Sequence, residues 1–165
     1  MFACLLAPDN PLECNVLSGE GEFLVRIPIG FDMATNHVFS VFAAMAVIPG
    51  QADIPGYELI FNLIESNLSG DDIKVYWDGR ETQEIIPNSI DRELVRNAVC
   101  TAVDVLIDAA GPNIVSMTTH EAGLPAKALT KFYDICAVFS GKGFKAGKSD
   151  VWHGRHIWMM EANGN

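Results

Sequence analysis

The chain has 165 residues, of which 49% are hydrophobic and 19% are charged. This length suits one globular domain, expected to span residues 1–165, and the composition excludes a disordered chain, which needs low hydrophobicity and dense charge. The formal net charge of −10 comes from 21 acidic and 11 basic residues, and such a field repels phosphate backbones and anionic lipid surfaces. We therefore expect neither a nucleic acid nor a membrane as a partner.

Cysteine usage predicts reduced thiols and a cytoplasmic protein. Cys4, Cys14, Cys100 and Cys136 form no C-x-x-C pair and have no nearby histidine, so the sequence predicts neither a zinc site nor a redox motif. No metal is expected. A disulfide between Cys4 and Cys14 stays open as an alternative. Residues 1–10 have no basic residue before their apolar stretch, so no secretory signal is expected.

The N-terminal part of the chain predicts two strands and then two helices. Residues 2–7 and 22–29 are short apolar runs that are typical of strands. Thr35 or Asn36 is a candidate cap for a helix that runs to Val47, includes most of the apolar run at residues 38–48 and ends before a Pro-Gly pair. Residues 57–66 place four aliphatic side chains on one helical face. Both of these segments are expected to be helices.

A hairpin is predicted next. Residues 71–78 alternate apolar and polar side chains, as a strand does. Asp78-Gly79 is the strongest short-range hairpin signal in the chain. We therefore expect residues 81–86 to form the partner strand.

The following elements are a helix, a strand and a second helix. Residues 89–110 repeat apolar side chains at helical spacing, with Asn88 as a candidate cap and Gly111 as the stop. Residues 114–118 are rich in β-branched side chains, which favours an inner strand. Pro125 is expected to begin the last helix. The apolar stripe of this last helix comprises Leu129, Phe132, Tyr133, Cys136 and Phe139.

Residues 145–150 and 155–161 predict a closing hairpin. Arranged around one sheet, these elements predict an α/β fold with a mixed central sheet and helices on both faces.

Several pieces of the C-terminal half occur in an order that is typical of one enzyme family. They are Ile86-Pro87 before the long helix, a strand ending in MTTHE, and the stretch ALTKFY at residues 128–133, with Gly143-Phe144 beyond it. The segment from Ile85 to Phe144 thereby resembles the GCN5-related N-acetyltransferase (GNAT) family. This resemblance implies an acyl-CoA N-acyltransferase-like fold, acetyl-CoA as the cofactor and an amine as the acceptor.

The resemblance also implies roles for particular side chains. In that family acetyl-CoA lies in a splay between two strands, and its pyrophosphate meets a glycine-rich loop at the start of the long helix. Tyr133 matches the tyrosine that protonates the departing CoA thiolate. The groups available as a general base are His120, Glu121, Glu81 and Glu84.

The chain departs from the family at the phosphate loop. Residues 88–93 contain no glycine, and Asp91 and Glu93 place two carboxylates where a pyrophosphate would meet them. Arg92 and Arg96 lie four residues apart on one helical face and are candidates for binding the phosphates of the cofactor. The alternative is ordinary ion pairing of these arginines with neighbouring acids.

A second cluster of polar and aromatic residues occupies residues 152–158. His153 and His156 are three apart, which puts them on opposite faces of a strand, and no third ligand accompanies them, so a metal site is not favoured. Gly154 is expected to form a turn, with the two indoles packed on the sheet and Arg155 facing a ligand, a partner or water. A homodimer contact through this hairpin is a further hypothesis.

The sequence supports two functions from different classes. The first is an acyl-CoA-dependent N-acetyltransferase-like enzyme that acts on a small-molecule amine. The second is a non-catalytic relative that kept the scaffold and binds a protein partner or a small ligand. The missing glycine loop favours the second function.

Overall fold

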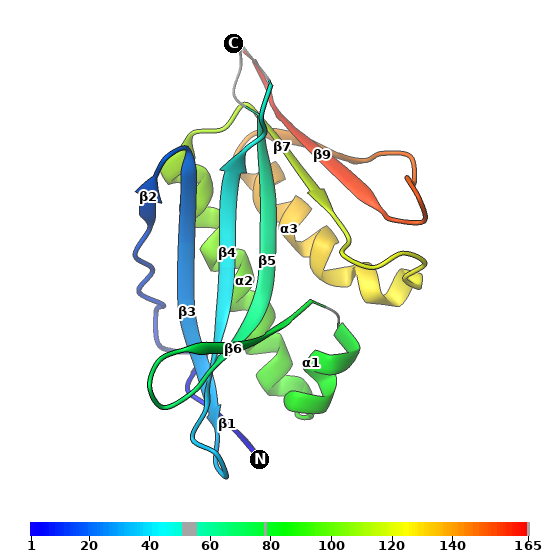
Figure 1. The fold of residues 1–165 in the computed structure, drawn as a ribbon. Coiled ribbons are helices and arrows are strands. Elements are labelled where there is room, and N and C mark those ends of the chain that lie inside the picture. Colours follow the sequence, from blue (N-terminus) through cyan, green and yellow to red (C-terminus); the bar gives the residue numbers. More distant parts are fainter. Residues whose placement is uncertain (51–55, 78, 165) are drawn as a thin grey trace.

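The computed structural model describes residues 1–50, 56–77 and 79–164, which form a nine-stranded sheet and its covering helices (Figure 1). The strands are β1 (Phe2–Cys4), β2 (Leu17–Gly19), β3 (Glu22–Asp32), β4 (Val38–Val47), β5 (Gly56–Ser66), β6 (Asp72–Tyr76), β7 (Ile114–Thr118), β8 (Phe144–Lys148) and β9 (Ile157–Ala162). The helices are α1 (Gly79–Ile85), α2 (Ser89–Ala110), the short 3₁₀ helix η1 (Ala126–Leu129) and α3 (Thr130–Gly141).

The strands follow the order β1-β3-β4-β5-β7-β9-β8, while β2 pairs with β3 and β6 pairs with β5. Strands β5 and β7 run parallel, and the other described pairs are antiparallel. The expected α/β class with a mixed central sheet is therefore confirmed. The parallel pair joins the N-terminal antiparallel part of the sheet to the C-terminal one.

The two helices expected over residues 36–47 and 57–66 are wrong, because these segments are the long central strands β4 and β5. Neighbouring residues of β4, such as Phe39 and Ser40, are both buried although they point to opposite faces. A strand that is buried on both faces is apolar throughout, and its sequence does not differ from that of a buried helix.

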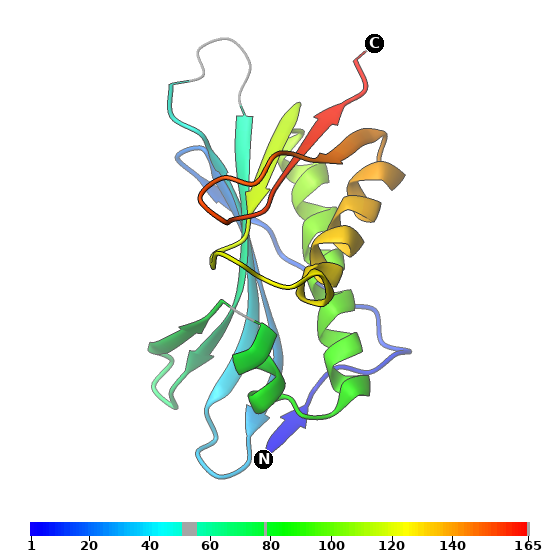
Figure 2. The ribbon, with the colours of Figure 1, turned by 90° about the vertical axis from the view of Figure 1, so that its right-hand side faces the viewer.

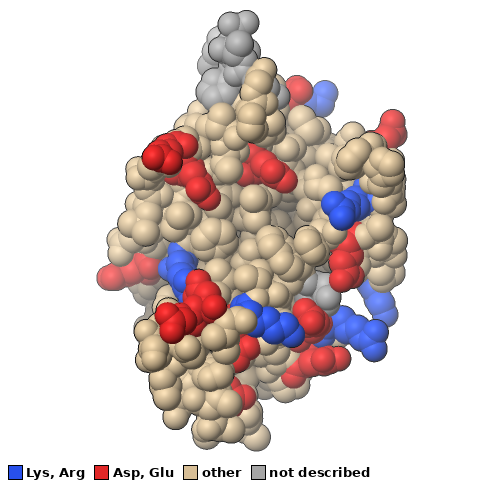
Figure 3. All heavy atoms as spheres, viewed as in Figure 1, with Lys and Arg blue, Asp and Glu red and all other residues tan. Residues whose placement is uncertain are grey.

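Because residues 36–47 and 57–66 are strands, they do not provide the helices that were expected on the second face of the sheet. Figure 2 shows α2 and α3 side by side on one face. On the opposite face, Figure 3 shows a broad central area that is free of charged side chains. Helices on both faces are therefore not seen in the described part of the chain.

The partner strand expected at residues 81–86 is also wrong, because this segment lies in α1 and the residue after it. Strand β6 pairs instead with the preceding strand, with Leu63 opposite Tyr76 and Glu65 opposite Lys74. The segment is rich in Glu, Thr and Gln, and Glu and Gln are good helix formers. Asp78 of the expected turn lies outside the described residues.

The C-terminal elements agree with the sequence. The Asn88 side chain caps α2, and Gly111 ends this helix in the left-handed conformation with φ 57°. Strand β7 has the expected bounds, η1 and α3 follow Pro125, and β8 and β9 form the closing antiparallel hairpin. In the part of the chain that the structure describes, no helix combines the length and apolar character needed to cross a membrane.

The hydrophobic core lies between the sheet and the two long helices. Strands β3, β4, β5, β7 and β9 contribute alternate side chains to it, and α2 and α3 contribute one face each. The buried helical side chains are Val95, Ala98, Ala102, Val103, Leu106 and Ile107 from α2, and Phe132, Ile135 and Phe139 from α3.

Candidate functional site

Strands β5 and β7 pair over only three residues before they diverge. Residues 56–58 pair with residues 114–116, and β6 joins the same edge of β5 only from Leu63 onward. Among the described strands, none pairs with residues 59–62 along this edge. Because backbone groups of a strand point alternately to its two sides, some N–H and C=O groups of residues 59–62 point into the gap.

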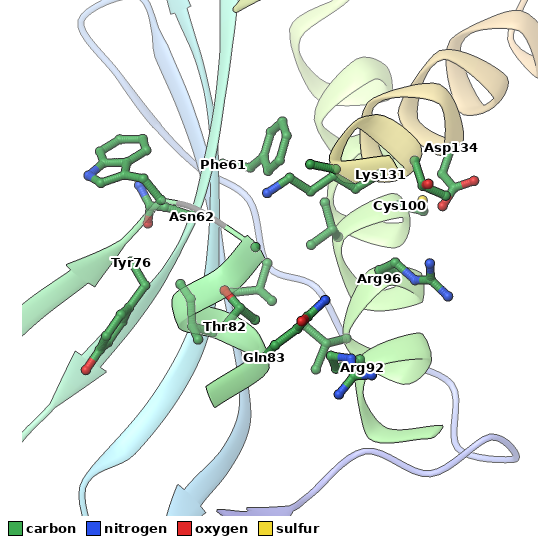
Figure 4. A pocket seen from close by; sticks show the side chains of 18 of the residues that line it. Phe61, Asn62, Tyr76, Thr82, Gln83, Arg92, Arg96, Cys100, Lys131 and Asp134 are labelled. Carbon is green, nitrogen blue, oxygen red and sulfur yellow. The ribbon is translucent and has the colours of Figure 1, made fainter. Parts of the chain in front are cut away.

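Two adjoining cavities lie along this gap. The first, the helix-side cavity, has a volume of about 350 Å³ and lies between β5, α1, α2 and the start of α3 (Figure 4). The second, the gap cavity, has a volume of about 330 Å³ and is lined by Glu58–Phe61 of β5 and Thr118–His120 at the end of β7. The two cavities share Phe61, Trp77 and Lys131 and therefore form one groove.

The groove concentrates positive charge in an acidic protein. Five of the 11 basic side chains of the chain line it, whereas Asp134 and Glu58 are the acidic ones among its described lining residues. Such an imbalance favours a ligand that carries negative charge. The five basic residues are Arg92, Arg96, Lys127, Lys131 and Arg155.

Two pairs of cations line the helix-side cavity, and each pair is spaced one helical turn apart. Arg92 and Arg96 come from α2, whereas Lys127 and Lys131 come from η1 and α3. In Figure 4, Lys131 extends from α3 toward Phe61 of β5. The Lys131 ammonium lies 5.6 Å from the centre of the Phe61 ring, which is cation–π distance.

The two arginines of α2 differ in their contacts. Arg92 donates through Nη1 to the carbonyl oxygens of Ile86 and Pro87, at 2.9 and 2.7 Å, and thereby fixes the turn before α2. Arg96 makes no hydrogen bond or ion pair with the residues that the structure describes. The alternative of ion pairing with neighbouring acids is therefore not observed, and the Arg96 guanidinium is available to a ligand.

The first turn of α2 is closed by its own cap. The Asn88 side-chain oxygen accepts hydrogen bonds from the backbone N–H groups of Ile90 and Asp91, at 2.8 and 3.4 Å. These amides are thus satisfied without an anion. Phosphate binding in this groove would depend on basic side chains.

Tyr133 lies apart from the groove. Its side chain is 51% exposed, which contradicts its expected place in the apolar stripe, and it is not among the described residues that line either cavity. Its ring instead meets the Trp158 ring edge-on, with 6.0 Å between centroids. The neighbouring Phe132 lines the gap cavity and stacks on Trp158. The position of Tyr133 thus does not support its expected role as an acid.

Among the candidate bases, His120 lies in the groove. It lines the gap cavity, and its ring stacks on Trp77 at 4.7 Å and 14°. Glu121 and Glu84 are not among the described lining residues of either cavity. Glu81 forms an ion pair with Lys74 at 3.4 Å. The structure thus places His120 in the same cavity as Lys131 and Arg155, whereas the other candidate bases are not among the described residues that line the groove.

Sequence reasoning missed several groove residues. Glu58 and Phe61 were not recognised because their segment was expected to be a helix, and Lys131 lies outside the apolar stripe expected for the last helix. Trp77 belongs to the segment at residues 71–78 that was expected to be a strand. The pairing of β5 with β7 determines which of these side chains border the gap, and this pairing joins residues more than fifty positions apart.

The four cysteines are free thiols, so the Cys4–Cys14 disulfide does not form. Cys100 lines the helix-side cavity. Burial, aided by nearby Asp134, raises the pKa of its thiol. A protonated thiol is a poor nucleophile, so Cys100 contributes shape to the cavity.

The hairpin tip agrees in part with expectation. Gly154 forms the turn, and Trp152 is 60% exposed, but Trp158 is only 1% exposed. A dimer contact through this hairpin would therefore not use Trp158, whereas the Trp152 side chain is accessible to a partner.

Comparisons of the chain with protein-family models, with curated proteins and with solved structures gave no match.

Proposed function

We propose that the groove binds an acyl-CoA thioester and that the protein transfers the acyl group to an amine. The observation that carries this proposal is the divergence of β5 from β7. It leaves one edge of residues 59–62 without a partner among the described strands, beside a groove rich in cations. An extended chain with amide groups, such as the pantetheine arm of CoA, adds to a free strand edge through main-chain hydrogen bonds. The resemblance of residues 85–144 to the GNAT family supports the same ligand.

Basic side chains provide the phosphate-binding groups that a glycine-rich loop provides in the GNAT family. Arg96, Lys127 and Lys131 line the helix-side cavity, and guanidinium and ammonium groups bind phosphates through charge-assisted hydrogen bonds. The phosphates of CoA would therefore lie in the helix-side cavity. The thioester would then lie in the gap cavity, next to His120.

The proposed reaction is a direct acyl transfer. The amine nitrogen attacks the thioester carbonyl carbon, a C–N bond forms, and the C–S bond breaks with its electron pair on sulfur. The proton lost by the nitrogen passes to the imidazole of His120, which is the candidate base in the gap cavity. The thiolate takes a proton from solvent, and the products are an amide and CoA.

Thermal unfolding in the presence of CoA or acetyl-CoA tests the binding step. A ligand at 100 times its dissociation constant stabilises the folded state by about 2.7 kcal/mol, so the melting temperature should rise with CoA concentration. The Arg96→Met variant should show a smaller rise, because it loses an unpaired cation of the helix-side cavity. Arg80→Met is the matched control, since Arg80 is exposed on α1 and is not among the described lining residues. An unchanged melting temperature at millimolar CoA would contradict the proposal.

The second candidate function is a non-catalytic binding module. The position of Tyr133 outside the groove and the self-capped start of α2 favour it. Release of free thiol from acetyl-CoA in the presence of an amine separates the two functions. Binding of CoA without thiol release supports the binding module.

A further inference from the structure

The gap cavity contains two opposite charges that have no partner in the described chain. Glu58 lies on β5 and Arg155 lies just before β9, and both side chains line this cavity. Neither forms a hydrogen bond or an ion pair through its side chain with the described residues. A carboxylate suits a ligand ammonium, and a guanidinium suits a ligand carboxylate through two parallel hydrogen bonds. The two charges therefore match a ligand that carries both groups.

Aromatic side chains form much of the remaining wall. Trp77 and Trp152 are both exposed, and both line the gap cavity from different loops. Trp77 is held flat against His120, while Phe61 and Phe132 lie behind with ring centroids 5.3 Å apart. Exposed indoles beside a cavity offer large flat surfaces on which a planar group packs favourably.

The hairpin tip that carries Arg155 is fixed by its backbone. Trp152 and Arg155 exchange two backbone hydrogen bonds, of 3.0 and 2.9 Å, across a turn in which His153 and Gly154 have φ values of 49° and 77°. Gly123 donates to the Gly154 carbonyl at 2.8 Å. The tip is therefore docked on the loop after β7, and a fixed frame lowers the entropic cost of binding.

A further set of contacts joins the hairpin tip to the segment that carries the candidate base His120. The backbone N–H of Thr119 donates to the His156 carbonyl at 3.0 Å, and the backbone N–H of His156 donates to Oγ1 of Thr119 at 3.1 Å. Thr119 precedes His120, and His156 follows Arg155. These bonds join the backbone next to His120 to the backbone next to Arg155, while both of these side chains stay available to a ligand.

The charge balance of the gap cavity disfavours a polycationic acceptor. Its described lining contains two basic residues, Lys131 and Arg155, and one carboxylate, Glu58. A polyamine needs several carboxylates, and Glu58 is the one carboxylate among the described residues that line this cavity. A ligand with one ammonium and one carboxylate needs only this one.

We propose that the amine acceptor is an aromatic amino acid. Its ammonium group binds at Glu58, its carboxylate binds at Arg155, and its ring packs against the indoles of Trp77 and Trp152. For the acyl transfer, the ammonium first loses one proton to solvent, and the neutral nitrogen then attacks the thioester. This assignment rests on the proposed acyl transfer for its role in a reaction. The amino-acid site itself is a property of the gap cavity and exists without CoA.

Titration of the full chain with L-phenylalanine, in the absence of CoA, tests the proposal through the indole fluorescence. We expect a saturable change in emission, because two of the three tryptophans line the cavity. 2-Phenylethylamine lacks the carboxylate and should bind about tenfold to a hundredfold more weakly, since a hydrogen bond to a charged group contributes about 1.5–3 kcal/mol. Spermidine should bind no better than 2-phenylethylamine.

The Arg155→Met variant provides the matched test. It should bind L-phenylalanine only as weakly as 2-phenylethylamine, while Arg80→Met should retain the preference of the unchanged chain. Far-ultraviolet circular dichroism verifies that each variant is folded. Equal binding of the two ligands by the unchanged chain, or an unchanged affinity of Arg155→Met for L-phenylalanine, would overturn the proposal. The titration contains no CoA, so failure of CoA binding and failure of this proposal are separate results.

Discussion

Glu65 shows how individual side chains far apart in the sequence form one polar network. One carboxylate oxygen accepts a hydrogen bond from the Tyr76 hydroxyl at 2.5 Å, and the other lies 2.7 Å from Nδ1 of His37. Burial opposes ionisation of Glu65, but the contacts with Tyr76 and His37 outweigh it, and the pKa of this carboxyl is lowered. Burial and Glu65 in turn raise the pKa of Tyr76. The sequence did not indicate this network, because three different segments bring its members together.

The lowered pKa of Glu65 predicts a pH dependence of stability. A carboxyl whose pKa is lower in the folded state stabilises the fold above its ordinary value of 4.5, and this contribution is lost as the pH falls through the folded-state pKa. Glu65→Gln should lower the free energy of unfolding at neutral pH by about 1–3 kcal/mol. It should also show a shallower loss of stability below about pH 4.5.

Urea denaturation at several pH values measures both effects of Glu65→Gln. Glu161→Gln is the control, since Glu161 is an exposed carboxylate on β9. Identical pH profiles for Glu65→Gln and the unchanged chain would contradict the assigned network.

At the scale of elements, local signals predicted some segments and failed for others. Helix α2 carries its own cap, its own stop and a regular apolar period, so its bounds follow from nearby residues. Strands β4 and β5 have no such local mark. Strand β4 is almost wholly apolar because most of it is buried, and β5 places Leu59, Leu63 and Ile64 at a spacing that also fits a helix. The groove was even less predictable, since it depends on where β5 and β7 stop pairing.

The cap of α2 yields a prediction at the same scale. Asn88→Ala removes the side-chain oxygen that accepts from Ile90 and Asp91, and loss of such a cap costs about 0.5–2 kcal/mol. The free energy of unfolding, measured by chemical denaturation, should fall by this amount. Asn97→Ala is the matched control, because Asn97 is exposed within α2 and alanine is the better helix former there. A larger loss for Asn97→Ala would contradict the cap assignment.

At the scale of the whole molecule, charge and strand order lead to the same place. The acidic chain gathers five of its basic side chains along the groove, and this groove begins where the parallel strands separate. The composition predicted only the net charge. The comparison with the GNAT pattern pointed to His120 as a candidate base and to Arg92 and Arg96 as candidate phosphate-binding residues. That Glu58 and Arg155 line the same cavity could not be predicted from the sequence, because they lie nearly one hundred residues apart in the chain.

Amide hydrogen exchange, followed residue by residue with and without CoA, tests the central claim most directly. If the pantetheine arm pairs with the free edge of β5, amides of residues 59–62 that face the gap should exchange more slowly when CoA is present. The amides of β4, which pair with β3 and β5 already, should change little. Unchanged exchange at residues 59–62 under saturating CoA would contradict the proposed binding mode.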